Sequence, residues 1–411
     1  MTAVTADLPR IPILPVLSWH ELAGAPRARA NGVLGIGAPQ LLNSGAAAIR
    51  AALELAGVGS GSSVLLPAFN CPAMVDAVVS AGATPRFYRI AADLAIGVAE
   101  VSAAFNDDTR AVLVPHLFSR VQDLLPIKEL CEQRGALLIE DCAHAMFGAL
   151  GAVAVGSVGH FAAASPRKFL PLMEGGLLTS ASRPVTVPNG VPRPGLVRAA
   201  RLAFDGVDVA ARFDHLRGLQ SAVKLLKTIA RSGAVVPDTS AVQASATVAP
   251  SSKIEISHAA ATTRVLLRRS LTQDAMQRRG ENYDYLVRNL RHVAGAQILD
   301  ATDPRTTGTV PYMVALLLDQ PGRQFDELKR RGMPMWRWEY SVRGVCDVTD
   351  WYAQALVQLP CHQSLRRAQL DWMIKCVDEV FGATRRRSTS AEARPEPASG
   401  ASAGALTRGH A

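Results

Sequence analysis

Residues 161–176 read FAAASPRKFLPLMEGG and place one lysine, Lys168, among residues that form turns. Pro171 and the pair Gly175-Gly176 close the segment, and proline and glycine at such positions favour a turn over a helix or strand. A leucine or an arginine would pack better here than a lysine does. We therefore expect the amine of Lys168 to have a chemical role, the alternative being a surface lysine in a loop.

A second polar group precedes this segment, at the end of the apolar run LLIED, residues 137–141. The run predicts a buried strand that delivers Glu140 and Asp141 at its carboxyl end, and open α/β sheets bind ligands at such ends. A lysine in a turn and an aspartate at a strand end are what a pyridoxal phosphate site needs. The lysine bonds to the aldehyde of the cofactor, and the aspartate pairs with its ring nitrogen. The alternative for Asp141 is a helix cap.

Strands and helices are expected to alternate on both sides of this strand, which predicts an α/β fold with a doubly wound, mostly parallel sheet. The expected strands are near-continuously apolar, as burial on both faces requires. They cover residues 63–69, 84–90, 111–118, 137–141, 159–165 and 175–180, and the expected helices cover residues 46–56, 71–83 and 126–136.

The second half of the chain predicts a smaller C-terminal α+β domain. It is expected to start with a long helix from 258 to 286 and to include strands near 295–299 and 310–319 and a helix over 325–333. The amphipathic piece 215–233 is expected to be helical. The predicted organisation is an irregular segment 1–30, a large α/β domain 31–257 with a basic insertion or flap at 183–252, a small domain 258–384 and a disordered tail 385–411.

Composition excludes several classes of protein. The formal net charge is +9, and most of it falls in the insertion and the tail. We expect these segments to form a solvated basic surface, and the alternative is weak attraction to an anionic surface. Basic residues are not interleaved with aromatic ones, so no nucleic-acid partner is expected. Neither a membrane span nor a signal peptide is expected. The six cysteines lack CxxC spacing, which argues against a zinc or other metal site and a disulfide framework and favours the cytoplasm.

The motifs of the chain resemble those of the DegT/DnrJ/EryC1/StrS family, the sugar aminotransferases of fold type I that depend on pyridoxal phosphate. The matching motifs occur in the same order over residues 40–365. They are SGAAAI (44–49), VLLP (64–67), PHLF (115–118), LIEDCAHA (138–145), Lys168 followed by EGG (174–176), and LPCHQSL (359–365).

The resemblance implies a role for each matching residue. Lys168 would form the Schiff base with pyridoxal phosphate and carry the transferred proton, and Asp141 would pair with the pyridine nitrogen. His144 would lie near the ring, or else be a core histidine. The phosphate would be held by the backbone amides of Ser44, Gly45 and Ala46, with Ser165 adding a hydroxyl.

The resemblance also implies a reaction. An amino donor, usually glutamate in this family, would supply the amino group to a keto group of a nucleotide-linked sugar or a related small molecule. The setting would be the biosynthesis of a cell-surface polysaccharide or a secondary metabolite, and the protein would be a cytoplasmic homodimer. Trp336, Arg337 and Trp338 could contact the substrate or simply pack at the edge of the small domain.

Four departures from the family pattern leave a second interpretation open. The family has a threonine at Ala46, a serine at Ala163, an aromatic residue near Asn70-Cys71, and, in place of residues 253–261, a segment whose asparagine reaches across the dimer. The alternative is therefore a non-catalytic relative that acts as a binding or regulatory subunit. A dehydratase branch of the family has histidine in place of the lysine, and Lys168 argues against it.

Overall fold

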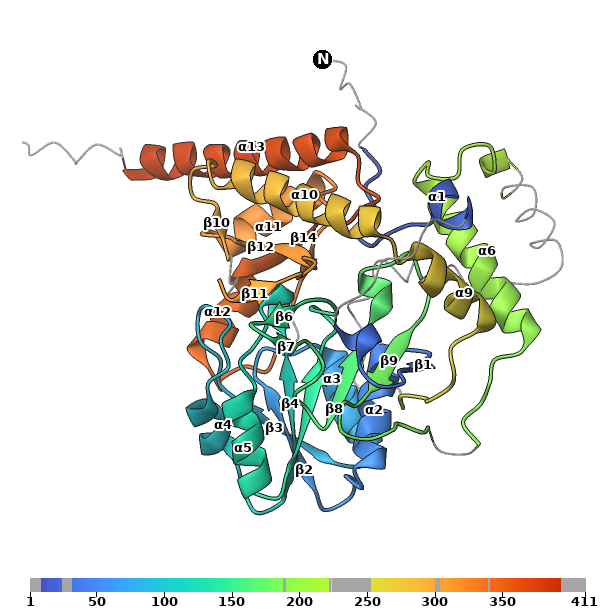
Figure 1. Cartoon of the computed structure of the whole chain (residues 1–411). Coiled ribbons are helices and arrows are strands. Elements are labelled where there is room, and N and C mark those ends of the chain that lie inside the picture. The colour runs from blue at the N-terminus through green and yellow to red at the C-terminus, as the bar shows by residue number, and fades with distance from the viewer. Residues whose placement is uncertain are drawn as a thin grey trace, which may run out of the picture.

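A seven-stranded sheet forms the centre of the larger part of the molecule (Figure 1). The computed structural model describes residues 9–23, 32–187, 190–221, 223, 253–299, 304–338 and 341–392. In spatial order the strands are β1 (Gln40–Leu42), β9 (Gly176–Thr179), β8 (Phe161–Ala164), β5 (Leu137–Asp141), β4 (Thr109–Pro115), β2 (Ser63–Pro67) and β3 (Thr84–Tyr88). Neighbours from β8 to β3 pair in parallel, and β9 runs antiparallel to both of its neighbours.

Helices cover both faces of this sheet, as the doubly wound prediction requires. The helices are α2 (Gly45–Leu55) and α3 (Pro72–Ser80) on one face, and α4 (Val98–Ala104) and α5 (Leu125–Gln133) on the other. Side chains of β4 alternate between the two cores: Leu113 packs with α2 and α3, whereas Val112 and Val114 pack with α4 and α5. Helix α4 was not among the expected elements. Strand β4 ends before the predicted 118, because residues 117–119 turn as a short 3-10 helix, η2 (Leu117–Ser119).

A second, antiparallel sheet lies in the C-terminal part, with helices packed on it (Figure 1). Its strands, in spatial order, are β10 (Gln297–Ile298), β12 (Met313–Leu317), β14 (Leu356–Pro360) and β13 (Trp336–Arg337). Its helices are α10 (Gln273–Leu290), α11 (Pro321–Arg330), α12 (Asp347–Ala355) and α13 (Arg367–Glu392). A small third sheet is made by β6 (Ala149–Leu150), β7 (Val153–Ala154) and β11 (Thr306–Thr307), so it joins the two parts of the chain. The α+β character of this part is as predicted, and the domain boundaries stay predictions.

The single long helix predicted over 258–286 is wrong. Two helices occupy the region, α9 (Ala261–Ser270) and α10, separated by an extended Thr272. The hydroxyl of Thr272 accepts a hydrogen bond from Ala275 N at 3.1 Å and caps α10, and a threonine that caps a helix cannot also continue the preceding one.

The predicted disorder of the tail is wrong for its first residues. Helix α13 continues through Glu392, well past the predicted start at residue 385, because extending an established helix by one residue costs little. The remainder of the predicted tail lies outside the described residues.

The insertion contains a helix, α6 (Leu196–Arg212), which packs against α9. Of the predicted helix 215–233, residues 222 and 224–233 lie outside the described part, and residues 215–218 form turns. The segment predicted to be irregular contains a short helix, α1 (Trp19–Ala23). None of the helices within the described ranges is both long and apolar enough to cross a membrane.

Candidate active site

Lys168 and Asp141 lie at the same edge of the large sheet. Asp141 is the last residue of β5 and pairs in register with Ala163 of the parallel strand β8. The turn after β8, a 3-10 helix η3 (Pro166–Lys168), therefore begins at the edge where Asp141 ends its strand. The Asp141 side chain is buried and that of Lys168 is half-buried. The sequence predicted this juxtaposition, and the structure places the two side chains close enough to interact electrostatically.

Burial shifts the pKa values of both groups toward their neutral forms. The pKa of the Lys168 amine is lowered by burial, which the nearby Cys71 and Asp141 oppose. The pKa of the Asp141 carboxyl is raised by burial, which Lys168 and the hydrogen bond from Ala143 N at 2.9 Å oppose. An amine with a lowered pKa loses its proton more readily, which is what a nucleophile or a proton carrier requires.

His144 presents a buried nitrogen toward this region. Its ring stacks on Tyr312, with centroids 4.1 Å apart, and no described residue hydrogen-bonds to its Nδ1. Burial, followed by the charge of Lys168, lowers the pKa of His144 well below the usual value. A neutral imidazole with an unpaired buried nitrogen is costly unless a further group binds there.

The residues expected to hold a phosphate, Ser44, Gly45 and Ala46 after β1 and Ser165 after β8, lie close together. The Ser44 hydroxyl accepts a hydrogen bond from Ala47 N at 3.1 Å and caps α2, so the amides of Gly45 and Ala46 lie at the start of the helix. A Cβ added to Gly45 would lie 3.2 Å from the Cβ of Ser165. A larger residue at Gly45 would therefore occupy the space between the helix start and the serine.

The glycine pair that closes the lysine segment fits this arrangement. Gly175 has a φ of 139°, which an L side chain rarely adopts, and it bridges to Ser44. Gly176 passes so close to the Ser44 carbonyl that a Cβ would collide with backbone. Glu174, just before the pair, accepts hydrogen bonds from Ala260 N at 2.7 Å and from Arg198 at 3.0 Å, and so ties the insertion to the lysine segment.

A buried arginine that sequence reasoning did not single out fixes the lysine turn. Arg279 of α10 is 2% exposed and its guanidinium lies over the Phe169 ring. It donates to five acceptors, the carbonyls of Pro311 (2.5 Å), Tyr312 (2.7 Å), Lys168 (3.0 Å) and Phe169 (3.2 Å) and the Gln363 side chain (3.2 Å). A lone arginine in a helix gives no sequence signal of such a role.

Trp338 packs against residues of the larger part of the molecule, whereas Arg337 packs on α11 within the C-terminal part. Trp338 contacts the rings of Phe69 at 4.7 Å and His144 at 5.3 Å, and the Arg337 guanidinium lies 3.6 Å from the centre of the Phe325 ring. These contacts favour the packing alternative for Arg337 and Trp338, whereas Trp336 also lines a cavity beside the lysine turn.

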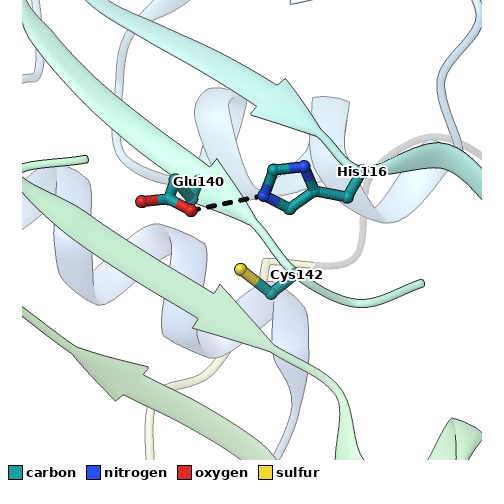
Figure 2. Close-up of side chains that lie close together, drawn as sticks. All are labelled: His116, Glu140 and Cys142. Carbon is teal, nitrogen blue, oxygen red and sulfur yellow. Dashed lines mark hydrogen bonds and ion pairs between the residues drawn. The ribbon is translucent and has the colours of Figure 1, made fainter. Parts of the chain in front are cut away.

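His116, Glu140 and Cys142 form a second buried cluster, shown in Figure 2. His116 Nδ1 accepts from Gln122 N at 3.0 Å, so its Nε2 carries the proton that it donates to Glu140 at 3.2 Å. Glu140 also accepts from the backbone amides of Gly156 (2.8 Å), Val158 (2.6 Å) and Gly159 (2.5 Å). Burial raises the pKa of the Cys142 thiol well above its usual value. A protonated nitrogen, a saturated carboxylate and a neutral thiol are structural partners rather than metal ligands.

Comparison with known proteins gives partial matches in sequence. Residues 40–185 match the model of the DegT/DnrJ/EryC1/StrS aminotransferase family. GDP-perosamine synthase of Vibrio cholerae is 32% identical over 177 residues, which are 42% of this chain and 46% of that protein. L-glutamine:2-deoxy-scyllo-inosose aminotransferase of Streptomyces kanamyceticus is 41% identical over 104 residues, 25% of this chain and 24% of that protein. The chain thus spans less than half the length of these curated relatives.

Comparison with solved structures covers nearly the whole chain. The pyridoxal phosphate form of the putative sugar aminotransferase Spr1654 from Streptococcus pneumoniae superposes with a TM-score of 0.63 at 16% identity, over 91% of this chain and 99% of that one. A likeness of this kind establishes the fold alone, and it confirms the predicted α/β aminotransferase architecture.

Proposed function

We propose, from the match of residues 40–185 to the model of the DegT/DnrJ/EryC1/StrS aminotransferase family, that the protein is an aminotransferase that depends on pyridoxal phosphate. The observation that carries the proposal is the juxtaposition of Lys168 and Asp141 at one edge of the large sheet.

The residues at this edge fit pyridoxal phosphate. His144 Nδ1, which has no hydrogen-bond partner among the described residues, offers a buried polar contact to a ring substituent, and the Asp141 carboxylate can accept a hydrogen bond from a ring nitrogen. The start of α2, with the narrow space between Gly45 and Ser165, suits a phosphate, because helix N-termini attract anions. When bound, the cofactor supplies an aldehyde for covalent attachment and a ring that withdraws electrons from the substrate.

Lys168 is the residue that would hold the aldehyde, and its amine would carry the proton that the reaction moves. Its lowered pKa supports both tasks, because each needs a neutral amine. Arg279 positions this amine through the Lys168 carbonyl, and the Tyr312 ring lies 5.4 Å from the amine nitrogen. Asp141 would pair with the protonated ring nitrogen, and Ser44, Gly45, Ala46 and Ser165 would hold the phosphate.

The substrates are an α-amino acid donor and a small molecule with a keto group. The names of the relatives support a sugar or cyclitol acceptor, nucleotide-linked or free, in polysaccharide or secondary-metabolite biosynthesis. Glutamate is the proposed donor, and the glutamine used by one relative is the second candidate. The six cysteines are free, which suits a reducing cytoplasm, and the enzyme would work there as a homodimer.

The test is the half-reaction with the donor alone. Protein incubated with pyridoxal phosphate should develop an absorption band at about 420 nm. Adding L-glutamate or L-glutamine should bleach the band and release the matching 2-oxo acid. Lys168→Ala should give neither result, whereas Lys128→Ala, which changes a lysine of α5 paired with Glu132, should behave like the wild type. Wild-type protein that forms no band and no 2-oxo acid would instead be the non-catalytic relative.

A further inference from the structure

Arg167, the residue before Lys168, has a charge that no neighbour in the described part of the chain neutralises. Its side chain is half-buried in η3, and no hydrogen bond or ion pair joins it to another described residue. Burial lowers the pKa of this guanidinium. An arginine held partly out of water without a partner is costly, and arginine is the side chain best suited to a planar anion. The arrangement therefore favours an anionic ligand as the partner.

Arg167 lines a small cavity of about 110 Å³ beside the lysine turn. One wall is the N-terminal segment 13–16, which is pinned by two hydrogen bonds between Val16 and Ser364, at 3.1 and 3.2 Å. The other walls come from Leu172 and Met173, from α6 and from Trp336. A complete ligand pocket usually measures roughly 300–1,000 Å³, so this cavity can hold one group of a ligand but not a nucleotide.

The acidic groups of the cavity already have partners. Asp208 pairs with Arg212 at 2.7 Å, and Asp205 is likewise engaged in an interaction. Neither carboxylate is among the charges that influence Arg167. The guanidinium of Arg167 is therefore available to a ligand in the cavity that it lines.

The cavity is also near the amine that is expected to react. Arg167 and Lys168 are consecutive, both interact with Tyr312, and the charge of Arg167 lowers the pKa of the Lys168 amine. In an α-amino acid the carboxylate is attached to the carbon that bears the reacting amine. A donor placed for reaction therefore has its carboxylate close to the Lys168 nitrogen. The diphosphate of a nucleotide-linked sugar is separated from its keto carbon by the sugar ring.

We propose that Arg167 binds the α-carboxylate of the amino donor through its two-pronged guanidinium, with the small cavity as the donor subsite. This inference rests on the proposed aminotransferase function. It adds a residue that determines donor specificity, and it gives the insertion a role, because α6 supplies one wall of the subsite.

Arg167→Gln tests the proposal, with Arg201→Gln as the matched control, since Arg201 is exposed on α6 and does not line the cavity. In the donor half-reaction, Arg167→Gln should raise the half-saturating L-glutamate concentration by about tenfold or more, the usual loss for a charge-assisted pair. Wild-type protein should prefer L-glutamate to its α-amide, L-isoglutamine, and the variant should lose this preference. The amount of bound cofactor should be unchanged.

The proposal is overturned if Arg167→Gln and Arg201→Gln behave alike, or if only the half-reaction with a nucleotide-linked acceptor is impaired. Failure of the proposed function gives a different result, because wild-type protein then forms no cofactor band. In that case calorimetric titration with L-glutamate still tests the proposed carboxylate site. Binding that is tenfold weaker in Arg167→Gln than in the wild type supports the site, and equal binding excludes it.

Discussion

Glu140 and Asp141 are consecutive in β5, and their side chains emerge on opposite faces of the strand. Asp141 faces the lysine turn, whereas Glu140 accepts hydrogen bonds from the backbone amides of Gly156, Val158 and Gly159. It also accepts one from His116, which Figure 2 shows. The Asp141 carboxylate is thus available for chemistry, whereas the Glu140 carboxylate holds the loop before β8 against β5.

Glu140→Gln should be strongly destabilising. A glutamine would turn an amide NH₂ toward groups that are themselves donors, leaving buried N–H groups unpaired at a cost of about 2–4 kcal/mol in the free energy of unfolding. Urea denaturation measures the change, with the exposed Glu129→Gln of α5 as control. A loss no larger than that of the control would mean that Glu140 is not held as described.

Sequence reasoning could find Lys168 and Asp141 because each stands in a pattern that packing does not explain: a lysine among turn formers and an aspartate at the end of an apolar strand. Arg279 has no such pattern. Its five acceptors come from segments far apart in the chain, so only the folded molecule brings them together. That no described residue pairs with Arg167 is likewise a property of the fold.

The lysine turn is a short 3-10 element that depends on its neighbours for its shape. Three residues of 3-10 helix are weakly stable alone, and Arg279 of α10 and Gln363 bond to its carbonyls. Helix α10 can reach the turn because Thr272 breaks the predicted long helix and redirects the chain. The sequence has no proline or glycine between residues 258 and 279, so no strong breaker marks this break, and the only local signal is the capping threonine.

Arg279→Lys should loosen the turn as well as destabilise the protein. Lysine has one charged nitrogen and cannot serve five acceptors, so we expect a loss of about 3 kcal/mol or more in the free energy of unfolding. The absorption band of bound cofactor should weaken in protein that is still folded. The exposed neighbour Arg278→Lys is the control. A folded variant with an unchanged band would show that the turn holds itself in place.

At the scale of the whole molecule, hydrogen bonds hold residues 12–16 of the N-terminal segment, here called the strap, against the loop that follows β14. His362 Nε2 donates to the Pro12 carbonyl at 3.0 Å, and no described residue hydrogen-bonds to its buried Nδ1. Burial, followed by the charge of Arg279, lowers the pKa of His362 to about 3. The strap therefore requires a neutral histidine, and the wall that residues 13–16 give to the cavity depends on it.

Lowering the pH should reduce the free energy of unfolding because of His362. The unfolded histidine takes up a proton below pH about 6.5 while the folded one does not, so stability falls as the pH drops from about 6.5 toward 3. Between pH 7 and 5 this single group should cost about 2 kcal/mol. His362→Gln keeps the donor to Pro12 and has no proton to gain, so its unfolding free energy should change less over that range. Equal losses in wild type and variant would exclude the histidine.

The large sheet was the most predictable part of the whole molecule, because its strands β2, β4, β5 and β8 are largely apolar runs bounded by turn signals. The strap, the insertion helix α6 and the small third sheet were not predictable, since each is stabilised by contacts between distant segments rather than by a local pattern.

Reductive labelling tests the role of Lys168 most directly. Protein loaded with pyridoxal phosphate is treated with borohydride, which fixes any bond between an amine and the aldehyde, and its peptides are mapped by mass spectrometry. We predict one stoichiometric pyridoxyl group, on the peptide that contains Lys168 and on no other. Labelling of a different lysine, or scattered substoichiometric labelling, would contradict the account.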